Sequence, residues 1–406
     1  MSLIRRPSFL LPTEKIDLYK WCTIACDQFT SQPQYWQELE DLIGDAPSTL
    51  HLIYPEVYLG KNRNTLTRTE CIRENMLRYL SEGILTLHSG YVLVQRTTSS
   101  GKQRLGLMCE VDLEQYDFSP DSTSPIRATE QTVTERLPVR VEIRKDAALE
   151  LPHIMLLMDD DGSFMRELFL LRSKLLYDTS LNMGGGAVRG YALDSDEKID
   201  SFLASLSSKE TLIKKYGRPD AIAFAVGDGN HSLATAKVCW ENIKKTLPEN
   251  LIDSHPARYA LCELVSLQDA SLDFEPIHRV VFDKDGEFVK YAADKLSGKG
   301  SLAAYSMGKR YVLSTPSGAS EAIEAVQRVI DDYCTDTGAS VDYIHGVDDA
   351  IEVAEKCNGT AIIMPLIRKA ELFKSVCAHG ALPRKSFSMG EGRDKRYYLE
   401  SRPITL

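Results

Sequence analysis

Apolar runs alternate with polar turns along most of this chain, and their length and period predict its helices and strands. Ala221–Val226 is a run of small and apolar residues with the length of a buried strand. The polar turn Gly227–His231 follows, and from Ser232 the apolar residues recur at a spacing that fits a helix better than a strand. The sequence therefore predicts a strand, a glycine-containing turn and a helix in succession.

The first 125 residues are expected to form a β-rich region. Two apolar segments, Tyr91–Arg96 and Arg104–Val111, are separated by a turn containing Ser and Gly, a pattern typical of paired strands. Helical periodicity appears in two stretches, Tyr35–Leu42 and Cys71–Glu82. The polar segment Asp117–Pro125 predicts a connector at the end of the region.

Two more regions are expected, residues 126–256 and 257–406, and the first of them is compatible with forming one domain with residues 1–125. Within it, an apolar helix is predicted to end near Tyr177, before a glycine-rich loop at 182–190. The third region alternates strands and helices, as in an α/β unit. Its predicted elements are the strands Arg279–Phe282, Arg310–Leu313 and Thr360–Pro365 and the helices Gly286–Leu296, Ala319–Tyr333, Asp348–Lys356 and Lys369–His379. The chain is thus predicted to be α+β or mixed α/β.

The turn after Val226 has the residues of an anion site. Gly227 and Gly229 let the backbone approach a ligand closely, and the first amides of the following helix favour negative charge. Asp228 can hold a metal or act as a base, and His231 can donate a proton or contact phosphate. The alternative is a plain connection in which Asp228 or Ser232 caps the helix. The turn matches neither a Walker loop nor the dinucleotide fingerprint.

Basic residues elsewhere complement this turn. Arg384 and Lys385 lie in a basic loop of an otherwise acidic chain, which favours a contact with phosphate or carboxylate. An exposed surface loop is the alternative. Glu130 lies near Arg127, and by residue type these charges favour the solvated face of an amphipathic helix over a site.

Composition limits the class of protein. The 406 residues exceed one ordinary core, and the net charge of -10 argues against a general nucleic-acid or anionic-membrane binder. No apolar run is long enough to span a bilayer, and the N-terminus lacks the pattern of a signal peptide, so a cytoplasmic protein is expected. Nine cysteines without a CxxC pair indicate free thiols.

Several segments resemble, in the right order, the signatures of a bacterial and archaeal family catalogued as domain of unknown function 1015. The segments are Trp21–Ser31, Ile126–Thr132, Gly227–Ser232, Pro276–Val281 and Leu382–Ser386. The family has no settled activity. A more distant resemblance is to the ParB/sulfiredoxin superfamily, which binds nucleotide phosphates at such a loop and includes kinases of free serine. The chain departs from these patterns at Asn230, Ser232 and Thr129, where His, Arg and His are usual.

The resemblance implies a ParB/sulfiredoxin-like core and a set of site residues. Asp228, His231 and Glu130 are the expected catalytic residues, and Asp228 and Asp27 the expected ligands of magnesium. The residues expected to bind phosphate or substrate are Gly227, Gly229, Asn230, Ser232, Arg127, Thr132, His278, Arg279, Arg384, Lys385 and Ser386.

Three functions stay open at this point. The first is a phosphotransferase that uses magnesium and ATP or ADP to phosphorylate a small hydroxyl compound, with free serine as the acceptor that the resemblance implies. The second is a regulator that binds a nucleotide or metabolite without catalysis. The third is a metal-assisted hydrolase that uses Asp228, His231 and His278. The expected partners are a nucleotide and a small-molecule substrate, and the oligomeric state is left open.

Overall fold

The computed structural model describes residues 2–59, 65–283 and 286–405, and the chain divides into two units. Unit 1 consists of Met1–Ala128, Thr132–Leu272 and Gly390–Leu406. Unit 2 consists of Thr129–Gln131 and Asp273–Met389. The expected regions 1–125 and 126–256 therefore lie almost entirely in one unit, and the chain leaves this unit after residue 272 and returns to it at residue 390.

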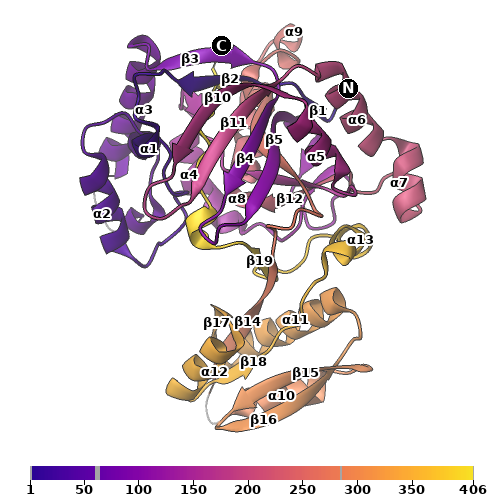
Figure 1. Ribbon diagram of the computed structural model, residues 1–406. Helices are drawn as coiled ribbons and strands as arrows, with labels where there is room; N and C mark the ends of the chain where they lie inside the picture. The colour runs from indigo at the N-terminus through magenta and orange to yellow at the C-terminus, as the bar shows by residue number, and fades with distance from the viewer. Residues whose placement is uncertain (1, 60–64, 284–285, 406) are drawn as a thin grey trace. The chain divides into compact units, whose positions relative to one another are not determined.

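A large mixed sheet forms the centre of unit 1 (Figure 1). Its strands, in spatial order, are β10 (Arg172–Ser180), β11 (Ala187–Leu193), β4 (Val92–Thr97), β5 (Gln103–Asp112), β13 (Tyr259–Ser266), β9 (Met155–Met158), β12 (Phe224–Asp228), β7 (Ile126–Ala128) and β6 (Tyr116–Asp117), with β1 (Ile4–Arg5) beside β5. The pairs β13–β9, β12–β7 and β6–β7 are parallel, whereas the pairs from β10 to β13 are antiparallel. The sheet therefore mixes parallel and antiparallel pairs, and with its helices it gives the mixed α/β fold that the sequence predicts.

Helices and two short ribbons complete unit 1. The α-helices are α1 (Leu18–Trp21), α2 (Pro33–Ile43), α3 (Thr65–Ser81), α4 (Leu137–Arg144), α5 (Ser163–Leu170), α6 (Asp196–Leu206), α7 (Lys209–Tyr216), α8 (Asn230–Lys244) and α9 (Glu249–Ile252). The ribbons are β2 (Ser8–Pro12) with β3 (Leu85–Ser89), and β8 (Leu149–Glu150) with β20 (Arg402–Pro403). Short 3-10 helices cover Thr49–Leu52, Glu56–Tyr58, Leu113–Gln115, Thr134–Arg136, Pro256–Arg258 and Gly392–Asp394.

The predicted pairing of β4 with β5 and the succession β12, turn and α8 are confirmed, as are α2 and α3. The predicted helix ending near Tyr177 is wrong, because α5 ends at Leu170 and Tyr177 lies in β10. β10 and β11 form an antiparallel pair around the glycine-rich loop. The apolar residues of this stretch fit a helix by spacing, but pairing with β11 decides the conformation.

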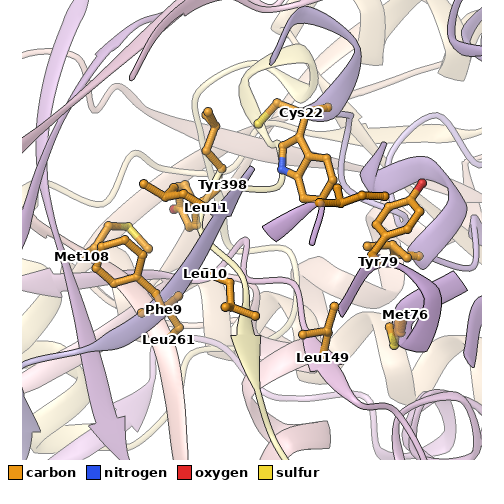
Figure 2. Close-up of a cluster of buried hydrophobic side chains, with 14 of the residues drawn as sticks. Phe9, Leu10, Leu11, Cys22, Met76, Tyr79, Met108, Leu149, Leu261 and Tyr398 are labelled. Carbon is orange, nitrogen blue, oxygen red and sulfur yellow. The ribbon is translucent and has the colours of Figure 1, made fainter. Parts of the chain in front are cut away.

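The larger apolar cluster of unit 1 joins distant parts of the sequence (Figure 2). Phe9 of β2, Tyr79 of α3 and Met108 of β5 pack in it with Leu399 near the C-terminus. A second cluster contains Trp36 of α2, which is fully buried. Burial of side chains this large is the main favourable term in folding, so unit 1 depends on residues from both ends of its sequence.

Unit 2 has its own sheet and helices. The strands are, in spatial order, β16 (Lys309–Thr315), β15 (Gly300–Ser306), β18 (Thr360–Ile362), β14 (Phe274–Phe282) and β17 (Ser340–His345), with β19 (Phe387–Met389) pairing with the start of β14. The helices are α10 (Glu287–Lys295), α11 (Ala319–Thr337), α12 (Val347–Lys356) and α13 (Lys369–His379). The predicted alternation is confirmed, although β15 and β17 were not predicted. The strand pairs of the described residues in this unit are antiparallel.

Candidate functional site

The bend between β12 and α8 is half-buried, because residues 227–232 are partly exposed except for buried Gly229. Gly229 has φ 79°, and its N–H donates to Oδ1 of Asp228 at 2.9 Å. The amides of Ser232 and Leu233 both donate to the carbonyl of Gly229 at 3.0 Å. A Cβ on Gly229 would lie 3.0 Å from Cα of Ile154, so the tight bend requires glycine for both conformation and space.

His153 lies against this bend. Its Nε2 is 3.0 Å from Oγ of Ser232, and its ring packs edge-on against Tyr397 at 5.0 Å between ring centroids. Only 9% of the residue is exposed, and burial lowers the pKa of the imidazole. His153 is therefore neutral near pH 7. Among the described residues, its Nδ1 has no hydrogen-bond partner.

Two carboxylates share the neighbourhood of His153. Burial opposes ionisation of Asp27, but nearby His153, Arg140 and Lys395 together hold the pKa of its carboxyl well below the usual range. Since the imidazole of His153 is neutral, the main cause of the low pKa of Asp27 is the permanent positive charge of Arg140, 3.6 Å away. Lys395 lies 3.6 Å from Oδ2 of Asp228. The two expected magnesium ligands thus lie in unit 1 among shared neighbours.

Asp27 and Asp228 are of the ligand type that Mg²⁺ prefers, because Mg²⁺ commonly takes one or two protein carboxylates and completes its shell with water and phosphate oxygens. Within residues 2–59, 65–283 and 286–405, no group of three or more His, Cys, Asp or Glu is arranged to hold a metal ion. A metal here would therefore depend on oxygens brought by a phosphate.

His231 and its neighbours line the start of α8. Nε2 of His231 accepts from the backbone N–H of Val133 at 3.3 Å. Two buried oxygens on the residues next to this pair, Oγ1 of Thr132 and Oδ1 of Asn230, have no hydrogen-bond partner within the described part of the chain. Since buried polar atoms are normally satisfied, these two oxygens favour a polar ligand at the bend.

Cys26, Glu56 and Arg140 form the other side of this region. Arg140 pairs with Glu56, whose pKa is raised by burial. Burial also raises the pKa of the Cys26 thiol to about 12, so the thiol stays protonated and unreactive. All nine cysteines have free thiols.

Arg127, which was expected to bind phosphate, holds the backbone of unit 1. Its Nε donates to the carbonyl of Ser124 at 2.6 Å and its Nη2 to the carbonyl of Asp220 at 2.5 Å. The residue is only 4% exposed. Its guanidinium therefore fixes the two segments beside β7 and β12.

Glu130 belongs to unit 2, where its carboxylate is surrounded by backbone amides. It accepts from the N–H groups of Lys385, Ser386 and Phe387 at 3.3, 2.8 and 3.1 Å. Burial raises its pKa, and these hydrogen bonds act in the opposite direction. Lys385 has φ 59°, which turns successive amides toward one anion. The basic loop was expected to contact a phosphate or a carboxylate. The group it binds is a carboxylate of the same chain, that of Glu130.

Arg279 fastens the same loop. It is completely buried, and it donates to Oε1 of Gln327 at 3.0 Å and to the carbonyls of Ile277 and Lys385 at 2.5 and 2.8 Å. Burial lowers its pKa to about 10, so it keeps its charge near pH 7. Ser386 is also buried, and its hydroxyl donates to the carbonyl of Pro383 at 2.6 Å.

His278 and Arg384 complete the predicted residues of unit 2. Nδ1 of His278 accepts from the amide of Met364 at 3.1 Å, and burial lowers the pKa of this imidazole. Exposed Arg384 donates from Nε to the hydroxyl of Tyr343 at 3.2 Å. His278 is thus a neutral histidine held in the sheet of unit 2.

The structure therefore gathers the predicted residues into two groups. Around the bend in unit 1 lie Asp27, Thr132, Gly227, Asp228, Gly229, Asn230, His231 and Ser232. Around the loop of unit 2 lie Glu130, His278, Arg279, Arg384, Lys385 and Ser386. Sequence reasoning missed three residues of the first group, His153, Arg140 and Lys395. A histidine directly after Pro152 and before a wholly apolar strand was the available signal for the first of them.

The fold is mixed α/β with a large mixed sheet. The chain belongs to the DUF1015 family, described as a protein of unknown function, whose profile matches residues 10–333. No curated protein matches the chain.

Solved structures similar to this chain include those of free serine kinases. One is a mutant free serine kinase in complex with AMP, with 12% identity and a TM-score of 0.40 over 73% of this chain and 91% of that chain. A second, in complex with ADP, has 11% identity and a TM-score of 0.40 over 75% and 94%. SbnI with a C-terminal truncation from Staphylococcus aureus has 9% identity and a TM-score of 0.38 over 70% and 82%. In the described part of the chain, no helix combines the length and apolar character needed to cross a bilayer.

Proposed function

We propose that the protein is a nucleotide-dependent phosphotransferase that acts on a small hydroxyl compound. The observation that carries this proposal is the half-buried bend before the 15-residue helix α8, where Lys395 lies 3.6 Å from Asp228 and is also a neighbour of the carboxylate of Asp27. A helix of this length favours a phosphate at its N-terminus. Ser232 stands where an arginine is usual, so the loop itself lacks a cation. Lys395, beside Asp228, supplies a cation to the site from another segment.

In the proposed reaction, the substrate hydroxyl oxygen bonds to the terminal phosphorus of ATP or ADP. The bond from that phosphorus to the bridging oxygen breaks, and the nucleotide leaves as ADP or AMP. Asp228 accepts the hydroxyl proton, and Lys395 and His231 are placed to interact with the phosphate. Asp27 and Asp228 would hold magnesium, which supplies charge neutralisation when bound. Free serine is the acceptor we propose to test first, with other small hydroxyl compounds beside it.

The test is incubation of the full chain with magnesium, ATP or ADP and each acceptor, followed by mass spectrometry of the products. We expect a phosphorylated acceptor and an equimolar amount of the product nucleotide. Asp228→Asn should lower the rate by about 100- to 1000-fold, since proton transfer and charge neutralisation each contribute on this scale. The matched control is Asp121→Asn, at an exposed position, which should leave the rate unchanged. Absence of product with every nucleotide and acceptor would contradict the proposal.

A regulator that binds nucleotide without turnover is the second candidate. The observation that favours it is the engagement of Arg127, Glu130 and Arg279 in hydrogen bonds to the chain's own backbone. Calorimetric titration with ATP, ADP and AMP separates the two functions. Binding that Gly229→Ala weakens, with no product over many hours, would identify the regulator.

A further inference from the structure

Unit 1 contains a cavity of about 140 Å³ behind the bend. Its lining includes residues of the two apolar clusters described above. Met76 and Leu149, both labelled in Figure 2, line it together with Leu52 and Tyr54 from the larger cluster and Ile53 from the smaller one. A cavity of about 150 Å³ holds one benzene molecule, so this cavity has room for a ligand of about that size.

Polar residues beside the start of α8 also line the cavity. They are His153, Ser232 and Thr235. Nδ1 of His153 has no hydrogen-bond partner among the described residues, although the residue is 9% exposed. A buried nitrogen without a hydrogen bond carries a free-energy cost. A ligand that supplies the missing hydrogen bond would recover that cost.

The charged groups that line the cavity already form ion pairs, although Nε of Arg140 has no hydrogen-bond partner among the described residues. Arg140 pairs with Glu56 and Asp27, and Arg144 pairs with Glu150. Glu150 also accepts from the backbone N–H of Leu261 at 2.7 Å. A ligand with a net charge would bring an uncompensated charge among these pairs and apolar side chains, which is unfavourable. The cavity therefore suits an uncharged ligand.

The hydrogen-bonding group of such a ligand follows from the chemistry of His153. If the Ser232 hydroxyl donates to Nε2, Nδ1 carries the proton and needs an acceptor; in the other tautomer, Nδ1 needs a donor. A hydroxyl group satisfies either tautomer, because it both donates and accepts.

We infer that this cavity is a binding site for a neutral alcohol or phenol with an apolar body of about six carbon atoms, whose hydroxyl meets Nδ1 of His153. The inference needs no phosphoryl transfer and is tested by binding alone, so its failure and that of the proposed function are distinguishable. Hydroxyl compounds of this class are also the acceptors that the proposed phosphotransferase should be offered, in addition to free serine.

The test uses phenol, benzene and benzoate as probes of the full chain, with calorimetry and proton NMR as readouts. Phenol should bind about tenfold more tightly than benzene, the effect expected of one buried hydrogen bond. Benzoate should not bind in the millimolar range. Phenol should also shift the imidazole resonances of His153 and leave those of His88 in place.

Variants locate the site. His153→Phe should abolish the preference for phenol and retain benzene binding, whereas Ala147→Leu, at a buried lining position, should abolish both. The matched control His88→Phe replaces a histidine of β3 that stacks on Phe9 and does not line the cavity; it should change neither affinity.

Three outcomes would overturn the inference. They are failure of phenol to bind the folded wild-type chain, equal affinity for phenol and benzene, and binding of benzoate as tight as that of phenol. If His153→Phe does not fold, the imidazole shifts of the wild-type chain decide the position of the hydroxyl, and unchanged His153 resonances at saturating phenol would overturn it equally.

Discussion

Units 1 and 2 both contain residues expected to bind phosphate, but the hydrogen bonds of these residues differ between the two units. In unit 1, Asp228, Asn230 and Ser232 lie on a half-buried bend where buried oxygens and one imidazole nitrogen find no partner among the residues that the structure describes. In unit 2, Arg279 is completely buried and bonded to carbonyls, and Glu130 is surrounded by backbone amides. Both places contain polar or charged residues. The hydrogen bonds of these residues are complete in unit 2 and incomplete at the bend of unit 1.

The state of its hydrogen bonds distinguishes a structural group from a binding group. A guanidinium or carboxylate whose hydrogen bonds are complete contributes to stability, and removing it should unfold the surrounding structure. A group with unused bonding capacity in a half-buried place contributes to ligand binding, and removing it should leave stability nearly unchanged. The comparison therefore predicts opposite effects of mutation in the two units.

The largest effect on stability is expected from Arg279→Met. Its loss leaves the carbonyls of Ile277 and Lys385 and the amide oxygen of Gln327 without a donor, so unit 2 should lose about 4 kcal/mol or more. Hydrogen exchange of peptides from residues 286–389 in a urea series measures this loss. Arg310→Met, at an exposed position of β16, is the matched control. A loss of stability below about 1 kcal/mol would contradict the structural role of Arg279.

A pH-dependent effect is expected from Glu400 in unit 1. Burial raises its pKa from 4.5 to about 7, although Tyr177 donates a hydrogen bond to it at 2.7 Å. Because the folded pKa is the higher one, this stabilisation is complete below pH 4.5 and is lost as the pH rises through about 7. The difference is about 3 kcal/mol.

Glu400→Gln should remove this dependence, so its unfolding free energy should change less between pH 4.5 and pH 8 than that of the wild type. Urea unfolding at both pH values measures it, and exposed Glu142→Gln is the control. Parallel pH profiles of the wild type and Glu400→Gln would show that Glu400 is ionised throughout.

A smaller effect is expected from Glu130→Gln. The variant keeps one acceptor oxygen but loses the charge that three amides face, at a cost of about 1–2 kcal/mol to unit 2. Activity measured below the unfolding transition should be retained, and exposed Glu135→Gln serves as control. If activity fell 100-fold with stability unchanged, Glu130 would be catalytic, as the sequence predicts, and the two units would not differ in this respect.

The smallest effect is expected from Gly229→Ala. The left-handed conformation alone costs about 1 kcal/mol for alanine, and the new Cβ also meets Ile154. Gly217→Ala is a matched control, because Gly217 has φ 75° and nothing lies within 4 Å of its Cβ position. Nucleotide affinity should fall several-fold in the first variant only, as calorimetry would show. Equal affinities in the two variants would mean that the bend does not bind the nucleotide.

Sequence reasoning succeeded where the determinants are local. The apolar run before Gly227 and the helical spacing after Ser232 determine β12 and α8, and the Ser- and Gly-containing turn determines the pairing of β4 with β5. It failed at β10, because its conformation depends on pairing with β11 and not on the apolar spacing around Tyr177.

The residues of the candidate site follow the same rule: those in one short segment could be predicted, and those from distant segments could not. Asp228 and His231 were accessible because they lie in one short turn, and Asp27 through the resemblance of its segment. His153 and Lys395 could not be assigned, since only the folded chain brings these distant segments to the bend. The internal partners of Arg279 and Glu130 are equally non-local, with more than 100 and more than 250 residues between donor and acceptor.

The interruption of unit 1 by unit 2 has a consequence for synthesis on the ribosome. Strand β20 pairs with β8, and Arg402 donates to the carbonyl of Pro256 at 2.9 Å. These contacts form only after residues 390–405 have left the exit tunnel, when residues 273–389 are already outside it. Unit 1 therefore stays incompletely folded during synthesis, with part of its apolar surface exposed, whereas the inserted segment can fold first.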